Sequence, residues 1–345
     1  MRKSYLRGMA VTAMLVLMLA GGELVAQQAT AAGNDAALQA ELEGIAAKHH
    51  GRVAMFAEQL NTGKTVVLDP DKPVQTASVI KLTILFEAME QVRAGKARWD
   101  EPIVLKPGDA VTGSGVLQFM DAPLTLTLKD ALTLMVILSD NTATNLMIDR
   151  FGVDAVNQRI AWMGLKDTHL YKKIMKPATE PMPADQPKFG LGKTTPREMA
   201  KVMERIGRCE LAGPGEPALP GDAAICSVAI NMLRNQFYRD TIPRYLETLD
   251  TTEEGSGIAS KTGSLNAVRN DVAIVAGKSG PMILSIFTYD NADHSWTVDN
   301  EGEVTIAKLA KAIVERWSPA GIDSKTLVPG LGLVPVAGAD AGASK

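Results

Sequence analysis

Ser78-Val79-Ile80-Lys81 is the stretch that decides how this 345-residue chain is interpreted. The apolar residues that follow recur at helical spacing, so Ser78 and Lys81 are expected on one face of a helix. A serine hydroxyl is a poor nucleophile until a base removes its proton, and a lysine can be that base only when its pKa is lowered. The pair predicts a nucleophile with its base, although Ser-x-x-Lys alone is common.

A second motif, Ser139-Asp140-Asn141, follows an apolar segment at 127–138 that is typical of a helix. Polar side chains at the end of such a helix can face a cleft. Ser139 can relay a proton toward a leaving nitrogen, and Asn141 can hydrogen-bond Lys81 and a substrate amide. The alternative is an ordinary polar helix end, in which Asp and Asn form a turn.

The third motif, Lys261-Thr262-Gly263, begins a predicted strand. Lys261 and Thr262 can donate hydrogen bonds to a substrate carboxylate, and Gly263 lets a substrate backbone lie close to the strand. Arg269 is expected on the next strand. It either adds a second cation for the same carboxylate or is a solvated surface arginine.

Strand patterns lie at both ends of the chain, and helical patterns lie between them. We expect an α+β fold in which residues 35–75 and 245–318 form an antiparallel sheet flanked by terminal helices. A helical domain, residues 76–244, is then inserted between the two parts of the sheet. The three motifs would meet in the cleft between sheet and helices.

The two ends of the chain are expected to lie outside this fold. Residues 1–31 have a positive head, a short apolar run and small residues, which is typical of a secretory signal peptide. An uncleaved membrane anchor is the alternative, but the apolar run is too short to span a bilayer comfortably. The sequence therefore predicts an exported protein, periplasmic or secreted, without a membrane partner after cleavage. Residues 329–345 are expected to be a flexible tail.

Charge and cysteine content limit the other partners. The net charge of −3 argues against a nucleic-acid partner. Cys209 and Cys226 either form a disulfide, as export permits, or are buried free thiols. They lack the spacing and the histidine partners of a zinc site, so no metal and no cofactor is expected. Nothing in the sequence requires more than a monomer.

With these motifs in this order, the chain resembles the penicillin-recognising serine hydrolases, and most closely the class A β-lactamases. The similarity runs over about residues 35–317. Residues 113–117 resemble the family's stretch before its second motif, and residues 194–200 resemble the helix start that follows its omega loop. Asn145 follows Asn141 by four residues, as the family's Ser-Asp-Asn-x-Ala-x-Asn pattern requires.

The resemblance implies that the protein opens the ring of penicillin-type β-lactams through an acyl-enzyme. Ser78 would be the acylated nucleophile, Lys81 its base or proton relay, and Ser139 the proton shuttle to the lactam nitrogen. The implied substrate-binding residues are Asn141, Lys261, Thr262, Gly263, Ser264 and Arg269. The implied oxyanion hole consists of the backbone N–H groups of Ser78 and Ser264.

The resemblance breaks down in the omega loop, near residues 166–196. The family usually has Arg-x-Glu-x-x-Leu-Asn there, and the glutamate activates the water that releases the acyl group. Counting forward from Gly164 puts Lys172 at the arginine position and Ile174 at the glutamate position. Counting back from Thr195 puts Glu180 one residue from the expected place. We predict Glu180 as the deacylating base, with an exposed loop glutamate as the alternative.

Three hypotheses follow, and all of them require acylation of Ser78. The first is a β-lactamase that hydrolyses the acyl-enzyme. The second is a D-alanyl-D-alanine carboxypeptidase that acts on peptidoglycan stem peptides. The third is a penicillin-binding or sensor protein with a long-lived acyl adduct. The lifetime of the adduct separates the first from the other two.

Overall fold

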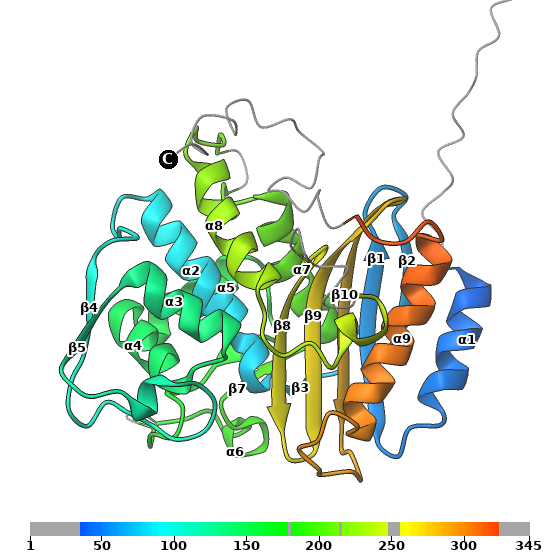
Figure 1. Ribbon diagram of the computed structural model, residues 1–345, viewed down its shortest axis with the longest axis horizontal. Helices are drawn as coiled ribbons and strands as arrows, with labels where there is room; N and C mark the ends of the chain where they lie inside the picture. Colours follow the sequence, from blue (N-terminus) through cyan, green and yellow to red (C-terminus); the bar gives the residue numbers. More distant parts are fainter. Residues whose placement is uncertain (1–34, 179–180, 214–215, 248–255, 324–345) are drawn as a thin grey trace, which may run out of the picture. The chain divides into compact units, whose positions relative to one another are not determined.

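Strands from the two ends of the chain pair in one five-stranded antiparallel sheet, in the order β2-β1-β10-β9-β8 (Figure 1). The computed structural model describes residues 35–178, 181–213, 216–247 and 256–323. The strands of this sheet are β1 (Arg52–Gln59), β2 (Lys64–Leu68), β8 (Ile258–Leu265), β9 (Val268–Gly277) and β10 (Gly280–Tyr289). The predicted α+β fold, with an antiparallel sheet made from both ends of the chain, is confirmed.

The two faces of the sheet pack against different helices, because successive side chains of a strand point to opposite faces. On β9, Ala273 and Val275 join an apolar cluster with α1 (Ala36–Ala46) and α9 (Glu301–Trp317). Ile274, between them in sequence, joins a larger cluster with the other helices. Figure 1 shows α1 and α9 together on one side of the sheet, away from the remaining helices.

The larger cluster is built around α2 (Lys81–Arg93). All ten residues of its first part, 81–90, are buried, so this helix is enclosed on every side. The helices packed with it are α3 (Leu128–Ile137), α4 (Asn141–Phe151), α5 (Val153–Trp162), α7 (Pro196–Arg208) and α8 (Asp222–Arg234). Shorter elements complete the structure: β3 (Val74–Gln75), η1 (Ala77–Ile80), β4 (Pro102–Leu105), η2 (Leu117–Phe119), β5 (Leu124–Thr127), β6 (His169–Leu170), α6 (Gln186–Phe189), β7 (Gly192–Thr194) and η3 (Ile242–Tyr245).

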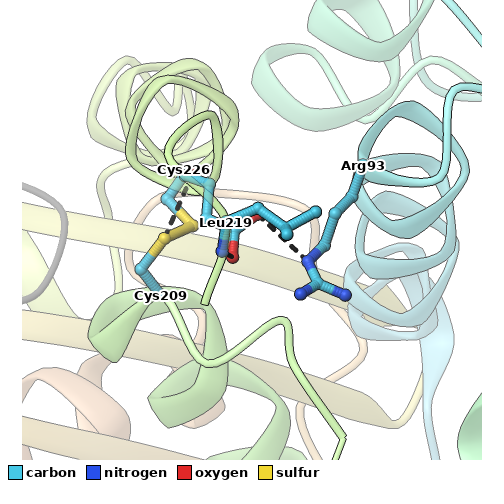
Figure 2. The surroundings of a disulfide bond; sticks show 5 residues. Arg93, Cys209, Leu219 and Cys226 are labelled. Carbon is cyan, nitrogen blue, oxygen red and sulfur yellow. Dashed lines mark hydrogen bonds and ion pairs between the residues drawn. A yellow bond between two sulfur atoms is a disulfide. The ribbon is translucent and has the colours of Figure 1, made fainter. Parts of the chain in front are cut away.

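The two cysteines form a disulfide. Cys209 ends α7 and Cys226 lies in α8, and the bridge joins two positions that are 17 apart in the sequence (Figure 2). A second link in the same region joins Arg93 of α2 to Asp222, the first residue of α8, at 3.0 Å. The disulfide and the ion pair together fix α8 to the rest of the helical cluster.

Several predictions about the organisation of the chain are not tested by this structure. The predicted signal peptide and the predicted tail both lie outside the described residues. They are residues 1–31 and 329–345. The described residues all belong to one compact unit, so the predicted boundaries at 76 and 244 stay predictions. Among the described helices, none is both long and apolar enough to cross a bilayer.

Candidate active site

Ser78 lies in η1, a single 3-10 turn, and Lys81 is the first residue of α2. The residue before the serine, Ala77, has a φ of 44°, in the left-handed region that is uncommon for a side chain with a Cβ. The turn is held from the sheet, because the Asn270 side chain donates to the Thr76 carbonyl at 3.1 Å. Gly263 of β8 comes so close that a Cβ there would lie 2.7 Å from the Ser78 nitrogen. Neighbouring elements therefore fix the nucleophile's backbone.

The Lys81 ammonium is fully buried and joins the first two motifs. It donates to the Ser139 carbonyl at 2.7 Å, to Ser139 Oγ at 3.1 Å and to Asn141 Oδ1 at 3.2 Å. Burial lowers the pKa of Lys81 well below its ordinary value, and the nearby positive charge of Lys261 lowers it further. The neutral amine, which is the form that a general base needs, is favoured as a result.

Ser139 Oγ lies between two lysines. Lys261 Nζ donates to this oxygen at 3.2 Å and to the Thr262 carbonyl at 2.8 Å. Burial lowers the pKa of Lys261 to about 7, and the Asp271 carboxylate opposes the shift. Ser139 itself has a φ of 52°. Its hydroxyl is thus placed to pass a proton between groups of the site.

Asp140, the middle residue of its motif, points away from this chain of hydrogen bonds. One carboxylate oxygen caps α4 by accepting from the Ala143 N–H at 2.8 Å, and the other accepts from the Val116 N–H at 2.7 Å. A Cβ on Gly115 would lie 2.2 Å from the carboxyl carbon of Asp140, so only glycine fits there. Asp140 therefore fixes the segment that carries Ser114, a residue of the cleft to which the sequence analysis assigned no role.

β8 is the edge strand of the sheet, and its outer side faces the nucleophile. The Thr262 carbonyl accepts from the Lys261 side chain, so this peptide oxygen points away from β9. Because backbone groups alternate in direction along a strand, the N–H of Ser264 points the same way as that carbonyl. This N–H is therefore free of the ladder with β9 and can face a ligand beside Ser78.

Two adjoining cavities of about 380 and 750 Å³ form the cleft. The four residues that line both cavities are Ser78, Ser114, Ser264 and Trp296. The smaller cavity also reaches Ser139, Thr262 and Gly263. The larger one reaches Asn141 and Ile174. The structure thus brings together, around Ser78, all the predicted site residues that it describes except Arg269.

Arg269 is not among the residues that line the two cavities of the cleft. The side chain is fully buried, its Nε donates to Glu303 at 3.0 Å, and two of its other donors are taken by the carbonyls of Leu265 and Val268. The Trp296 ring covers the guanidinium at 4.7 Å. Neither alternative of the sequence analysis describes this residue: it is not solvated, and its donors are turned to the protein rather than to a substrate carboxylate.

The omega loop places Ile174 in the wall of the larger cavity. Asn145 holds the Ile174 backbone from both sides, because its Nδ2 donates to the Ile174 carbonyl and its Oδ1 accepts from the Ile174 N–H, each at 2.9 Å. Ile174 is only 8% exposed and lines the larger cavity together with Ser78. Glu180 lies outside the described residues, so its predicted role stays a prediction.

The neck of this loop is closed by a different set of groups from those of the family pattern. Asp185 accepts from the Tyr171 hydroxyl at 2.9 Å and from Lys193 Nζ at 2.8 Å. Lys172, at the predicted arginine position, instead donates to the Lys176 carbonyl at 3.1 Å. A carboxylate therefore still closes the loop, but through a tyrosine and a lysine.

No group of three or more His, Cys, Asp or Glu side chains in the described segments is arranged to hold a metal ion. The groups that the structure brings together near Ser78 are hydroxyls, amines and backbone donors. These are a serine nucleophile, a lysine of lowered pKa beside it, a hydroxyl between two amines, and an open strand edge. Together they define an acyl-transfer site of the serine type.

Comparison with known proteins gives the family. Residues 37–317 match the model of the β-lactamase enzyme family, and the chain therefore belongs to it. Family membership supports a function in β-lactam hydrolysis or β-lactam sensing. A curated relative, the β-lactamase regulatory protein BlaB of Streptomyces cacaoi, is 24% identical over 306 residues, which cover 78% of this chain and 95% of that protein.

Solved structures agree with the fold. The β-lactamase from Sphaerobacter thermophilus DSM 20745 matches with a TM-score of 0.68 and 28% identity, over 87% of this chain and 98% of that one. PBP-A matches with a TM-score of 0.68 and 21% identity, over 83% of this chain and 97% of that one. At 21% identity, the second likeness is one of fold.

The charge of Lys261 should be visible in the pH dependence of acylation. The ammonium carries its proton below about pH 7 and loses it above, so its attraction for an anionic β-lactam weakens as the pH rises through 7. Arginine stays protonated throughout this range. We expect the acylation rate constant of the wild type, divided by that of Lys261→Arg, to fall between pH 6 and 8.5. Identical profiles for both proteins would show that Lys261 does not act through its charge.

Proposed function

We propose that this protein is an exported serine enzyme that β-lactams acylate on Ser78 and that releases the acyl group slowly. The observation that carries the proposal is the pinning of Ile174 by Asn145, because Ile174 is the residue that the count from Gly164 assigns to the position of the family's deacylating glutamate. Family membership supports acylation, and the identity of this one residue supports slow release.

Acylation uses groups that lie together in the structure. Lys81, as the neutral amine, takes the proton of the Ser78 hydroxyl while the oxygen attacks the lactam carbonyl. The backbone N–H groups of Ser78 and Ser264 stabilise the negative charge that develops on the carbonyl oxygen. The proton reaches the lactam nitrogen through Ser139 Oγ, which already bonds Lys81 and Lys261. Thr262 and Lys261 hold the substrate carboxylate.

Deacylation needs a second base that activates water. An isoleucine side chain cannot accept a proton, and among the described residues that line the larger cavity there is no carboxylate. General-base catalysis typically contributes a factor of about 10² to 10⁴, so a site without the base keeps its ester for correspondingly longer. The leucine-to-glutamate variant of PBP-A, solved as an acyl-enzyme complex with penicillin G, supports the acylation step in this fold.

The second candidate is complete hydrolysis with Glu180 as the base. The likeness to the Sphaerobacter thermophilus β-lactamase, at 28% identity, favours it. In that case Glu180 would have to reach the same water from another part of the loop. The two candidates share every step up to the ester and differ only in its lifetime.

The lifetime can be measured by intact mass spectrometry. The purified exported form is mixed with penicillin G, unbound antibiotic is removed, and the mass is followed for hours, with peptide mapping of the adduct. We expect a one-to-one adduct on Ser78 that persists for hours. Return to the free mass within seconds would favour complete hydrolysis. No adduct, or one on another residue, would contradict the acyl-transfer proposal itself.

A further inference from the structure

The two cavities of the cleft can hold different parts of an acyl donor that reacts with Ser78: the leaving part and the acyl chain. The smaller cavity reaches Ser139 and Thr262, the groups that serve the leaving nitrogen and its carboxylate in the proposed mechanism. The leaving part of the substrate therefore occupies that side. The larger cavity, of about 750 Å³, also borders Ser78 but is lined by the omega loop, and it is left for the acyl chain.

The wall of the larger cavity is mainly apolar. Its apolar lining residues of large size are Ile174, Met175, Phe189, Leu191, Leu265 and Trp296. Met175 is 67% exposed and Trp296 is 66% exposed, so both have apolar surface available for contact with a ligand. Such a wall fits a hydrocarbon or aromatic acyl chain.

The charges of the larger cavity are all positive. Lys172 and Lys173 are the only charged side chains among the described residues that line it. The smaller cavity has the opposite character, with Asp240 and Glu303 in its wall. An anion on the acyl chain is therefore attracted to the larger cavity, and this attraction depends on the two lysines.

The two lysines differ in what already neutralises them. Lys173 forms an ion pair with Asp149. Lys172 Nζ donates to the Lys176 carbonyl at 3.1 Å, and no carboxylate of the described residues is paired with it. A carbonyl leaves the charge of an ammonium uncompensated. Lys172, which also borders a neighbouring cavity lined by His169 and Tyr171, is thus the cation that can accept an anionic ligand.

We propose that the larger cavity is a subsite for acyl chains that carry a carboxylate, and that Lys172 binds this carboxylate. The inference rests on the proposed acylation of Ser78 and adds the chemical class of the acyl donor. The carboxylate branches from the acyl chain, so that the hydrocarbon packs on Trp296 and Met175 while the charge meets the ammonium.

Penicillin G and carbenicillin provide the test, because they differ by one carboxylate on the acyl side chain. The measurement is the second-order rate constant of acylation for each antibiotic, in wild type, Lys172→Met, Lys172→Arg and Lys173→Met. For Lys172→Met we expect a fall of roughly tenfold for carbenicillin and less than twofold for penicillin G, the size of a partly exposed charge contact. Lys172→Arg should keep the wild-type ratio.

Lys173→Met is the matched control, since it removes a neighbouring lysine that Asp149 already pairs. It should leave the ratio of the two rate constants unchanged. The proposal is overturned if Lys172→Met lowers both rate constants equally, if it changes neither, or if Lys173→Met gives the larger shift. Failure of both antibiotics to acylate the wild type would instead contradict the proposed function.

Discussion

Ile174→Glu is expected to shorten the lifetime of the penicillin acyl-enzyme by about 100-fold or more, the lower range of general-base catalysis. Asn145 fixes the backbone of this residue through two hydrogen bonds of 2.9 Å, so the new side chain starts from a defined place beside Ser78. The acylation step should change little, because Lys81 and Ser139 are untouched. The measurement is the return of free enzyme mass, or of hydrolysed penicillin, after a single turnover.

Two matched variants separate the effect of the carboxylate from that of its shape. Ile174→Gln has nearly the same size as the glutamate variant but no basic oxygen, and its acyl-enzyme should stay long-lived. Glu180→Gln in the wild-type background should leave the lifetime unchanged under the proposed function. A wild-type lifetime that is short and becomes long in Glu180→Gln would instead establish Glu180 as the base and remove the argument from Ile174.

Lys81→Met is expected to slow acylation of Ser78 by roughly a thousandfold, within the range of a lost general base. The same change should leave the thermal unfolding midpoint equal or higher. The folded-state pKa of Lys81 lies below its unfolded value, so at neutral pH the fold loses stability by holding this amine where it is disfavoured as an ammonium. A residue kept at a cost in stability is typical of a functional site.

Acylation and unfolding must be measured on the same preparation. Slow acylation with an unchanged or raised midpoint shows that the amine acts on chemistry. An equally fast reaction in Lys81→Met would exclude Lys81 as the base. Lys81→Arg is the useful companion, because it retains a positive charge but cannot become neutral in this pH range, and it should be as slow as the methionine variant.

The sequence was sufficient for the fold and for most of the site. Apolar, β-rich runs predicted the strands at both ends, and helical spacing predicted that Ser78 and Lys81 share one face, both from local pattern. The grouping of these two residues with Ser139 and Lys261 was implied by the resemblance to the family. The forward count along the omega loop also identified Ile174, although Glu180 was preferred.

What the sequence could not give depends on contacts between distant segments. Arg269 was expected at the cleft or in solvent, but its partner Glu303 lies on α9 and its cover, Trp296, precedes that helix. The choice between a disulfide and free thiols likewise required the packing of α7 on α8. The sequence showed Asn145 only as part of the family's motif. Its two hydrogen bonds to the Ile174 backbone join residues that are 29 positions apart, so only the structure could show them.

The outward-facing N–H of Ser264, at the edge of β8, has a consequence for inhibitor design. A molecule that accepts a hydrogen bond from it uses a main-chain group that no point mutation of a side chain removes. Resistance to such a compound by substitution would then have to come from altered side chains around it, or from a change in strand geometry that also damages turnover. Rigid, extended peptide mimics whose amide carbonyl can accept from the Ser264 N–H are therefore the scaffolds best matched to this strand edge.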